Sequence, residues 1–438
     1  MNGGKIIQRF DPNLRANDDY LMGAVSGFVN YLENREAKLG GRTRERKVTD
    51  RAKFHLAIEC LLSNLIVAYA RSPKTLLNVP LSNNMLRGSP RYRPVVYGKH
   101  FRDLITLMVN LHLIKIVTKG HNVREWCRRE ITTIRPTATL LKAFPLIATV
   151  MHNAFTRIDL PEVIVLKNSD GQFLDYSDSN DTRRWRDELR KINDYLRRAS
   201  ISIIGSPEML LDENGFTIRP DVRALRRIWN NGKWTQGGRL YDGFWQTMKR
   251  EQRPHMIRID GRPIANVDFS QFNLRLAYAL AKIRPPRGDL YDVTGDDVSG
   301  RDWMQLREGR KKLTSAMFNR SATLKGWPGE TAQERKKLAA CFAKGTTARI
   351  ATSEIRAKHS AIADYFENSR GLGFMRIESD ILVATLLSLM KRGITALPNH
   401  DAVLVARHHA LTAKATLQLE SKRRIGTAIP AEINTGGG

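Results

Sequence analysis

The chain has 438 residues, and its 72 Lys and Arg against 44 Asp and Glu give a formal net charge of +28 at pH 7. Its 42% apolar residues are enough to bury sizeable cores, and its length predicts two or three domains. So large a positive charge predicts a polyanionic partner. Because the charge is spread along the chain rather than gathered in one amphipathic helix, nucleic acid is favoured over a membrane surface as that partner.

Three widely separated cysteines, Cys60, Cys127 and Cys341, exclude a disulfide framework and a zinc site made of cysteine alone. The apolar run at 54–70 is interrupted by a His, a Glu and an Asn, so we expect a buried helix rather than a membrane span there. Residues 1–13 have no apolar core and no cleavage signature, so we expect no secretion signal. Together these features predict a cytoplasmic protein.

Residues 1–50 are polar and rich in Gly and Arg, which predicts a basic flexible arm, and a helical DNA-binding module is expected over 51–150. Within that module, apolar residues at helical spacing over 98–111 are followed by two β-rich runs around a polar turn over 113–137. A helix followed by a β-hairpin with a basic tip is typical of a winged helix. The alternative is a small α+β module that only packs against its neighbour. The basic residues expected to face a DNA backbone are Arg91, Arg93, Lys99, Arg102 and Lys119.

Residues 151–230 predict a linker and a basic helical region. The run PEVIVLK at 161–167 predicts a short strand, and the polar stretch after it is the best candidate for a domain boundary. The helix expected at 182–199 has an apolar stripe that includes Trp185 and Leu189, and its opposite face is strongly basic. That face is either solvated or in contact with nucleic acid.

The strongest local pattern begins at residue 264, where an apolar strand ends in Asp268 and a helix follows. An acid at the tip of a strand is placed to bind a divalent metal in a cleft, although a lone Asp there is also typical of a helix N-cap. A second strand tip is expected within 392–409, where two apolar runs flank His400 and Asp401 in a β-hairpin turn. Turn chemistry alone also accounts for that pair.

Between these two strand tips lies a helix expected over 306–321. Polar residues at a spacing of four share one of its faces and suit a polyphosphate, because two cations one turn apart reach the same ligand. The alternative is a solvated basic face. The residues are Arg307, Lys311, Ser315 and Asn319. Two acids at strand tips with this helix between them predict a site for two divalent metals and a nucleoside triphosphate, and hence template-directed nucleotidyl transfer.

The same segments resemble the motifs of family-A DNA polymerases, the bacterial polymerase I type. VDFSQFNLRLA at 267–277 resembles motif A, which reads DYSQIELR, and the helix at 307–320 resembles motif B, R-x3-K-x7-YG. NHDAVLV at 399–405 resembles motif C, HDE followed by apolar residues. GGRLYDGFWQTM at 237–248 is similar to the GRLSS…NLQN segment, and GDLYDVTG resembles the segment after motif A. Five motifs in the right order, over a little under half of the chain, are hard to obtain by chance.

The resemblance implies an α+β, right-hand fold: a palm of antiparallel strands and helical fingers over 231–438, after a mostly helical N-terminal region in which 151–230 is thumb-like. Asp268 and Asp401 would bind two Mg²⁺ or Mn²⁺ ions and catalyse the addition of nucleotides to a 3′-OH. Arg307 and Lys311 would hold the triphosphate. The sugar and base pocket is implied at Asn273, Ser315, Phe318 and Asn319, and primer-template contacts at Arg239, Gln246, Gln271 and His400.

This chain departs from the family pattern at several positions. Asn273 stands where the family has the Glu that blocks a ribose 2′-OH. Asn319 and Arg320 replace the Tyr-Gly of motif B, which leaves Phe318 to supply the ring beneath the base, and Ala402 replaces the Glu of motif C. The first 230 residues show no acid set that matches a 3′–5′ exonuclease. The pattern is that of a compact, diverged relative, similar to proteins of phages and mobile elements.

The sequence therefore predicts a DNA polymerase of family-A type without proofreading, with DNA as its partner, nucleoside triphosphates as substrates and no membrane contact. A bacterial or phage-infected cytoplasm is the expected location, at the nucleoid, and a small accessory protein or a helicase is a further candidate partner. A first alternative is a primase that starts chains with ribonucleotides, which Asn273 favours. A second is a catalytically inactive DNA-binding replication factor.

Overall fold

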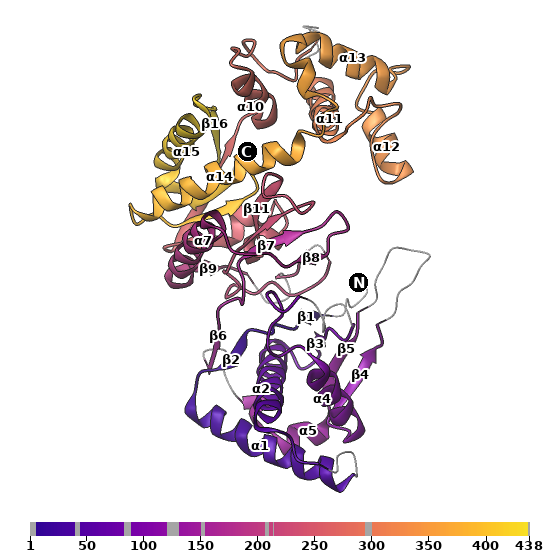
Figure 1. Cartoon of the computed structure of the whole chain (residues 1–438), viewed down its shortest axis with the longest axis vertical. Helices are drawn as coiled ribbons and strands as arrows, with labels where there is room; N and C mark the ends of the chain where they lie inside the picture. The colour runs from indigo at the N-terminus through magenta and orange to yellow at the C-terminus, as the bar shows by residue number, and fades with distance from the viewer. Residues whose placement is uncertain are drawn as a thin grey trace.

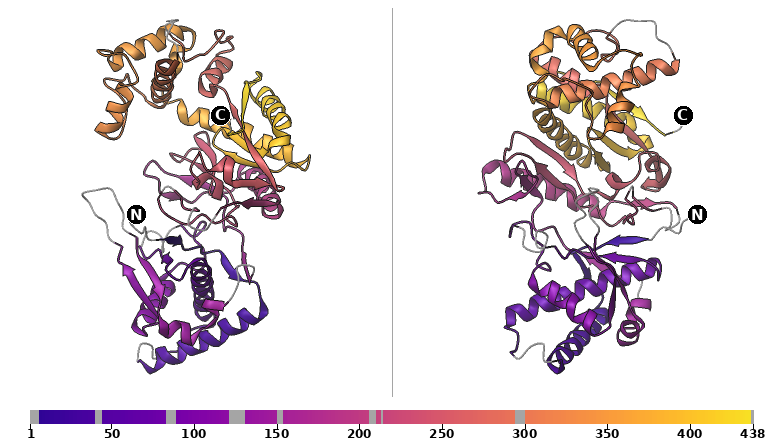
Figure 2. Two further views of the ribbon diagram at one scale, coloured as in Figure 1. Left: turned by 180° about the vertical axis from the view of Figure 1, so that it is seen from behind. Right: turned by 90° about the vertical axis from the view of Figure 1, so that its right-hand side faces the viewer.

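The computed structural model describes residues 6–39, 44–82, 89–120, 131–149, 154–205, 210–212, 214–293 and 300–436. Helices and mixed sheets alternate in these residues, so the predicted α+β class is confirmed. The molecule is elongated, with helix α1 (Asp19–Lys38) at one end and a group of helices that includes α11 (Gly300–Asn319), α12 (Ala332–Ala339) and α13 (Ala348–Lys358) at the other (Figure 1). The two further views agree with this order of parts (Figure 2).

An N-terminal unit, which we define as the described residues up to 149, has its own hydrophobic core. Its four-stranded sheet has the order β1-β3-β5-β4. The strands are β1 (Ile7–Arg9), β3 (Leu76–Asn78), β5 (Thr133–Pro136) and β4 (Ile114–Thr118), and the helices are α1 (Asp19–Lys38), α2 (Val48–Arg71), α4 (Lys99–Asn110), α5 (Ala138–Ala143) and α6 (Leu146–Thr149). A short ribbon of β2 (Leu14–Ala16) and β6 (Phe155–Arg157) joins this unit to the rest of the chain.

The prediction of a flexible arm over 1–50 is wrong for most of its described residues. Residues 19–38 form helix α1, and a stripe of its side chains is buried against the N-terminal core. The buried residues are Leu21, Val25, Phe28, Val29 and Leu32. The polar composition hid this stripe, because one apolar residue every three or four positions is enough to anchor a helix whose other faces are solvated.

The helix and hairpin expected over 98–137 are present. Helix α4 is followed by the antiparallel pair β4 and β5, and β5 also pairs with β3 inside the sheet. The expected basic tip, at 121–130, lies outside the described residues. A winged-helix assignment for this unit stays a prediction.

The apolar run at 54–70 lies within helix α2 and is a core helix, as predicted. Among the described residues, α2 is the one helix long and apolar enough to cross a membrane, but 67% of its apolar stretch is buried inside the protein.

A second core runs from Val163 to Ala431 and includes both sides of the boundary expected at 230/231. Strands on both sides of that boundary pair with each other in a sheet of order β11-β10-β7-β8. Its strands are β7 (Ile164–Lys167), β8 (Phe173–Leu174), β10 (Arg226–Trp229) and β11 (Gly237–Tyr241), and α7 (Asn180–Arg198) packs on it. The predicted division into 151–230 and 231–438 is therefore wrong, because the two segments share strands and a core.

A six-stranded central sheet occupies the middle of this second core. Its path is β14-β15-β13-β12-β9, and β16 pairs with the other half of β13. The strands are β9 (Ile201–Ile203), β12 (Ile257–Ile259), β13 (Arg262–Phe269), β14 (Ala396–Asn399), β15 (Ala402–Ala406) and β16 (Ala431–Asn434). Short helices α8 (Phe244–Thr247) and α9 (Arg253–Met256) precede β12 in the chain, and α15 (Ala410–Ile425) packs on the sheet after the short 3₁₀ helix η4 (Arg407–His409).

Helix α14 (Gly371–Met390) connects the central sheet to the group of helices at the end of the molecule. It contacts β11, β14 and α15, and it also contacts α11 (Figure 1). The remaining helices of this part are α10 (Phe272–Ala281), α11 (Gly300–Asn319), α12 (Ala332–Ala339), α13 (Ala348–Lys358) and η3 (Ser360–Tyr365). The helix expected over 306–321 thus falls within α11, apart from its last two residues, and it lies beyond the end of the sheet.

Truncation of a buried side chain of α1 tests whether residues 19–38 belong to the N-terminal core. We expect Leu32→Ala to lower the free energy of unfolding by about 2–5 kcal/mol, because Leu32 is wholly buried and its loss leaves a cavity. Tyr20→Ala on the same helix should change it by less than about 0.5 kcal/mol, since Tyr20 is 74% exposed. Urea unfolding followed by circular dichroism measures both. Equal stability of the two variants would contradict the placement of α1.

Candidate active site

The pairing register of the central sheet brings Asp268 and Asp401 together. Asp268 is the second-to-last residue of β13 and pairs directly with Ala402 of β15. Asp401 immediately precedes Ala402, in the two-residue turn that joins β14 to β15. The turn is tight because His400 takes a positive φ of 59°, the conformation that the first turn residue of a type II′ hairpin requires. Both predicted acids therefore lie at one end of the sheet, on adjacent strands.

Burial and a neighbouring negative charge disfavour the ionised form of the Asp268 carboxyl group. Its pKa is raised from 3.8 to about 7, first by burial and then by the neighbouring charge of Asp401. The Lys311 ammonium lowers the same pKa, so it lies close enough to act on the pair. Among the described residues, the Oδ1 atom of Asp268 is buried and has no hydrogen-bond partner. A buried acceptor in this state is suited to a cation.

Glu378 of α14 adds a third acid beside this pair. Its pKa is raised to about 7 by burial, although Arg239 lowers it, and Asp401 contributes to the increase. Arg239 of β11 holds Glu378 through two hydrogen bonds of 2.7 Å, one to each carboxylate oxygen. The close approach of β11 to α14 depends on Gly238, whose φ is 86° and where a Cβ would lie 2.9 Å from the Oγ of Ser379.

The predicted phosphate-binding face of α11 is exposed. Lys311, Ser315 and Asn319 are solvent-accessible along it, and Arg307 is half-buried. Arg307 forms an ion pair with Asp289, and its guanidinium lies 5.3 Å from the ring centre of Tyr291. The structure thus places these four residues on one face, as the spacing predicted.

Gln271 ties this helix to the tip of β13. It follows β13 with a positive φ of 55°, and its Nε2 donates a 2.8 Å hydrogen bond to Asp289. Asp289 therefore connects Gln271, three residues after Asp268, to Arg307 on α11. The sequence-predicted primer-template role of Gln271 stays a prediction.

Two predicted site residues have other roles in the structure. Phe318 is wholly buried and packs against Phe366 and Phe374, with ring centres 4.9 and 5.1 Å away, so it is a core residue and not part of a base pocket. Gln246 donates to the carbonyls of Leu240 and Pro398 and accepts from the Gly243 amide. With both ends of its amide engaged, Gln246 supports the strand that leads to His400 rather than contacting a primer-template.

The other two predicted residues remain open to a ligand. Asn273 is half-buried on the first turn of α10, directly after the tip of β13. His400 is exposed in the hairpin turn, and its pKa is lowered first by partial burial and then by Arg239. A neutral His400 can donate or accept a hydrogen bond beside the two acids.

The five basic residues expected to face DNA in the N-terminal unit do not share one environment. Arg91 donates hydrogen bonds to Asp175, Glu162 and the carbonyl of Tyr176. Its guanidinium therefore binds groups within the protein and does not face a DNA phosphate. Arg102 donates to the carbonyl of Leu81. Lys99 and Lys119 are exposed at the start of α4 and the end of β4, and Arg93 is half-buried.

Sequence reasoning missed Glu378 and Asp289. Glu378 falls four residues after Phe374 and four before Leu382, on the buried stripe of α14. An acid on an apolar stripe was the available signal, because such a residue needs a partner when buried. Asp289 lies in the GDLYDVTG segment, but nothing in that segment indicates that it pairs with Arg307.

The donor set at the end of the sheet fits a divalent cation. The described residues contain no group of three or more His, Cys, Asp and Glu side chains arranged to hold a metal ion. Two close carboxylates nonetheless suit Mg²⁺, which keeps several waters and takes one or two protein carboxylates with phosphate oxygens. The buried Oδ1 of Asp268 and the repulsion from Asp401 are the observations that a cation would relieve.

No protein-family model matches this chain, and no curated protein matches it. Among solved structures, it is similar to the polymerase domain of Pol1 from M. smegmatis, which was solved in complex with DNA primer-template and dNTP. The TM-score is 0.32 and the sequence identity 13%. The match covers 63% of this chain and 59% of that one, which is less than two thirds of the solved domain. So low a score carries no conclusion about function.

Neutralising Asp268 should stabilise the metal-free protein in a pH-dependent way. The pKa of this group is near 7 in the folded state against an ordinary value of 3.8 in the unfolded chain, so the folded state loses stability as pH rises from about 4 to 7. We expect Asp268→Asn to stabilise the protein on the order of 4 kcal/mol at pH 8, and progressively less below pH 7. Urea unfolding in EDTA from pH 5 to 8 measures this. The same gain at every pH would contradict the assignment.

Proposed function

We propose that this protein is a template-directed nucleotidyltransferase, a DNA polymerase of the family-A type with a right-hand arrangement. In this proposal the central sheet serves as the palm, and α11 with its neighbouring helices serves as the fingers. The observation that carries the proposal is the meeting of Asp268 and Asp401 at the end of the sheet, with Lys311 close enough to lower the pKa of Asp268.

Asp268 and Asp401 would hold the divalent cations. Divalent cations held there would activate the 3′-hydroxyl of the primer and offset the charge on the leaving pyrophosphate. Lys311 and Arg307 would bind the triphosphate, because their exposed face on α11 lies beyond the carboxylate pair. Release of Arg307 from Asp289 frees a planar guanidinium that pairs with phosphate through two hydrogen bonds.

Arg239 and Glu378 would position the primer terminus. The two bonds between them fix the Arg239 guanidinium beside Asp401, and His400 projects from the same turn as that acid. Arg239 keeps a quarter of its side chain exposed. It can therefore contact the minor groove of a primer-template while Glu378 holds it in place.

The choice between ribose and deoxyribose would depend on Asn273. Asn273 is a neutral amide on the first turn of α10, where it would face the ribose or deoxyribose of the incoming nucleotide. If that amide leaves room for a 2′-OH, the same site would serve a primase that starts chains with ribonucleotides.

DNA binding outside the site would use exposed basic faces. Helix α7 exposes such a face, opposite the buried stripe of Trp185 and Leu189. Its exposed cations include Arg183, Arg190, Lys191 and Arg198. Contacts to phosphate of this kind weaken as salt rises, because bound counterions are no longer released to a dilute solution.

Primer extension tests the proposal. The purified protein is incubated with Mg²⁺ or Mn²⁺, primed or unprimed single-stranded template, and labelled dNTPs or rNTPs. Extension of the primed template that Asp401→Ala abolishes supports a polymerase, and products from unprimed template with rNTPs support a primase. Activity that survives Asp401→Ala would overturn the site. No product in any lane, with DNA binding intact, would favour the inactive binding protein.

Adjacent lysines on α11 provide a matched pair of variants. We expect Lys311→Ala to lower kcat/KM for the incoming nucleotide by about 10- to 100-fold, because a cation that holds the triphosphate is lost. Lys312→Ala should leave kcat/KM within about twofold, since Lys312 is exposed one position away and lies 3.9 Å from Glu308. Steady-state extension kinetics with varied dNTP concentration measure both. Equal losses in the two variants would show a general charge effect rather than a binding role.

A further inference from the structure

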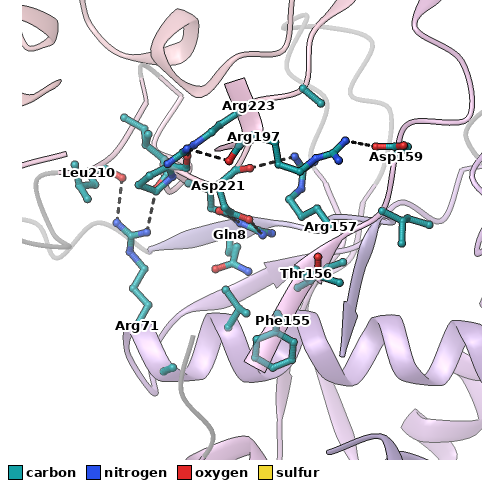
Figure 3. Close-up of a pocket in the computed structure, with 18 of the residues that line it drawn as sticks. Gln8, Arg71, Phe155, Thr156, Arg157, Asp159, Arg197, Leu210, Asp221 and Arg223 are labelled. Atoms are coloured by element: carbon teal, nitrogen blue, oxygen red, sulfur yellow. Dashed lines mark hydrogen bonds and ion pairs between the residues drawn. The ribbon is translucent and has the colours of Figure 1, made fainter. Parts of the chain in front are cut away.

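A cavity of about 690 Å³ lies between the N-terminal unit and the second core, away from the carboxylate pair. Its walls come from β1, α2 and β6 on one side and from α7, Leu210 and residues 218–224 on the other. Figure 3 shows Gln8 and Phe155 on the side of the N-terminal unit, with Arg223 and Arg197 facing them from the other side. No step of the proposed reaction uses these residues.

The lining of the cavity is strongly cationic. Five arginines and two aspartates line it, and Asp11 outside the lining pairs with two of these arginines, which leaves an excess of two positive charges. They are Arg71, Arg157, Arg197, Arg219 and Arg223 against Asp159 and Asp221. The five hydrogen bonds that Arg223 donates all go to backbone carbonyls, so these contacts orient its guanidinium without neutralising it. An anion is the ligand that such a lining favours.

One buried donor in the cavity wall has no hydrogen-bond acceptor within the described part of the chain. It is Nε2 of Gln8, whose residue is 1% exposed. Arg219, in the same wall, forms an ion pair with Asp11, with 3.3 Å between Nη1 and a carboxylate oxygen. A buried amide donor without an acceptor costs stability unless a ligand supplies one.

The cavity is too large and too apolar for a bare inorganic anion. A volume of about 690 Å³ is typical of sites for drug-sized ligands and cofactors. Apolar side chains lie on both walls among the cationic groups, and the ring of Phe155 offers a surface for stacking. The apolar lining residues are Leu14, Val67, Ala70, Phe155, Ile158, Leu210, Ile218 and Ala224.

We propose that this cavity binds a mononucleotide, with its phosphates among the arginines and its base against Phe155. The bound nucleotide accepts a hydrogen bond from the Gln8 amide and bridges the N-terminal unit to α7 and residues 218–224. It therefore stabilises one placement of the two parts of the molecule. This inference does not rest on the proposed polymerase activity, because none of the lining residues belongs to that site.

The test must separate this cavity from the proposed triphosphate site on α11. The background is therefore full-length protein with Arg307→Ala and Lys311→Ala in EDTA. The probes are each of the four ribonucleoside triphosphates, adenosine and inorganic phosphate, titrated by calorimetry. We expect 1:1 binding of at least one triphosphate, and at least tenfold weaker binding of adenosine and of phosphate. Phosphate binding as tight as triphosphate binding would overturn the nucleotide assignment.

Three variants in that background locate the binding. Gln8→Met keeps the side-chain shape and removes the donor, so we expect about tenfold weaker binding with an unchanged melting temperature of the free protein. Arg197→Ala removes a charge from the cavity, and binding should weaken at least fivefold. Arg198→Ala, next to it on α7 and outside the cavity lining, should leave binding unchanged.

Absence of saturable binding, or binding that neither Gln8→Met nor Arg197→Ala weakens, would overturn the proposal. Because Arg197 is exposed, its variant is expected to fold even if Gln8→Met does not. Failure of primer extension would leave this result unaffected, since the background already lacks the cations of the α11 face.

Discussion

Repulsion between Asp268 and Asp401 is the constraint on which the rest of the site depends. Strand pairing leaves the two acids no freedom to separate, because Asp268 pairs with the residue directly after Asp401. Folding alone would not favour this arrangement, since it raises the pKa of Asp268 and leaves one of its oxygens buried without a partner among the described residues. The surrounding cations, Lys311 on one side and Arg239 on the other, offset part of the cost. Sites that store an unfavourable charge in this way are typical of binding or catalysis.

Helix α14 fixes strands β10 and β11, and β11 carries Arg239. Glu378 binds Arg239 of β11, and the next two residues of the helix, Ser379 and Asp380, bind Arg227 of β10. Asp380 also pairs with Arg376 and Arg424, and the buried Arg227 lies 4.8 Å from the ring of Trp229. Burial lowers the pKa of Arg227 to about 9, so its charge needs Asp380 nearby. Charged groups buried this deeply fix the register between helix and hairpin more than they add stability.

The sequence predicted the local elements well and the long-range partnerships poorly. Asp268, Asp401 and the face of α11 were found because strand tips, turns and a spacing of four are visible over a few residues. Glu378 was missed because its partner Arg239 lies 139 residues away. Phe318 was misassigned because the sequence does not show whether an aromatic ring beside a polar face points to a ligand or to other core residues. In the structure it packs against Phe366 and Phe374. The arm over 1–50 and the boundary at 230/231 failed for a related reason: composition does not show which strand a segment will pair with.

The junction between the two cores contains a cluster of buried charges among its apolar contacts. Burial would raise the pKa of Asp11, but Arg157 and Arg219 lower it, and Arg219 also pairs with Asp221. Cavities of about 690 and 450 Å³ are both lined by Arg157 and Arg219, so this ion cluster lies between two spaces that apolar side chains do not fill. Replacing water around buried ions costs nearly as much as their attraction returns. Such an ion cluster fixes the orientation of the two cores relative to each other but adds little to the free energy that holds them together. A ligand that bridges it with a few charge-assisted hydrogen bonds therefore changes the relative stability of that orientation far more than the same ligand would across an apolar core.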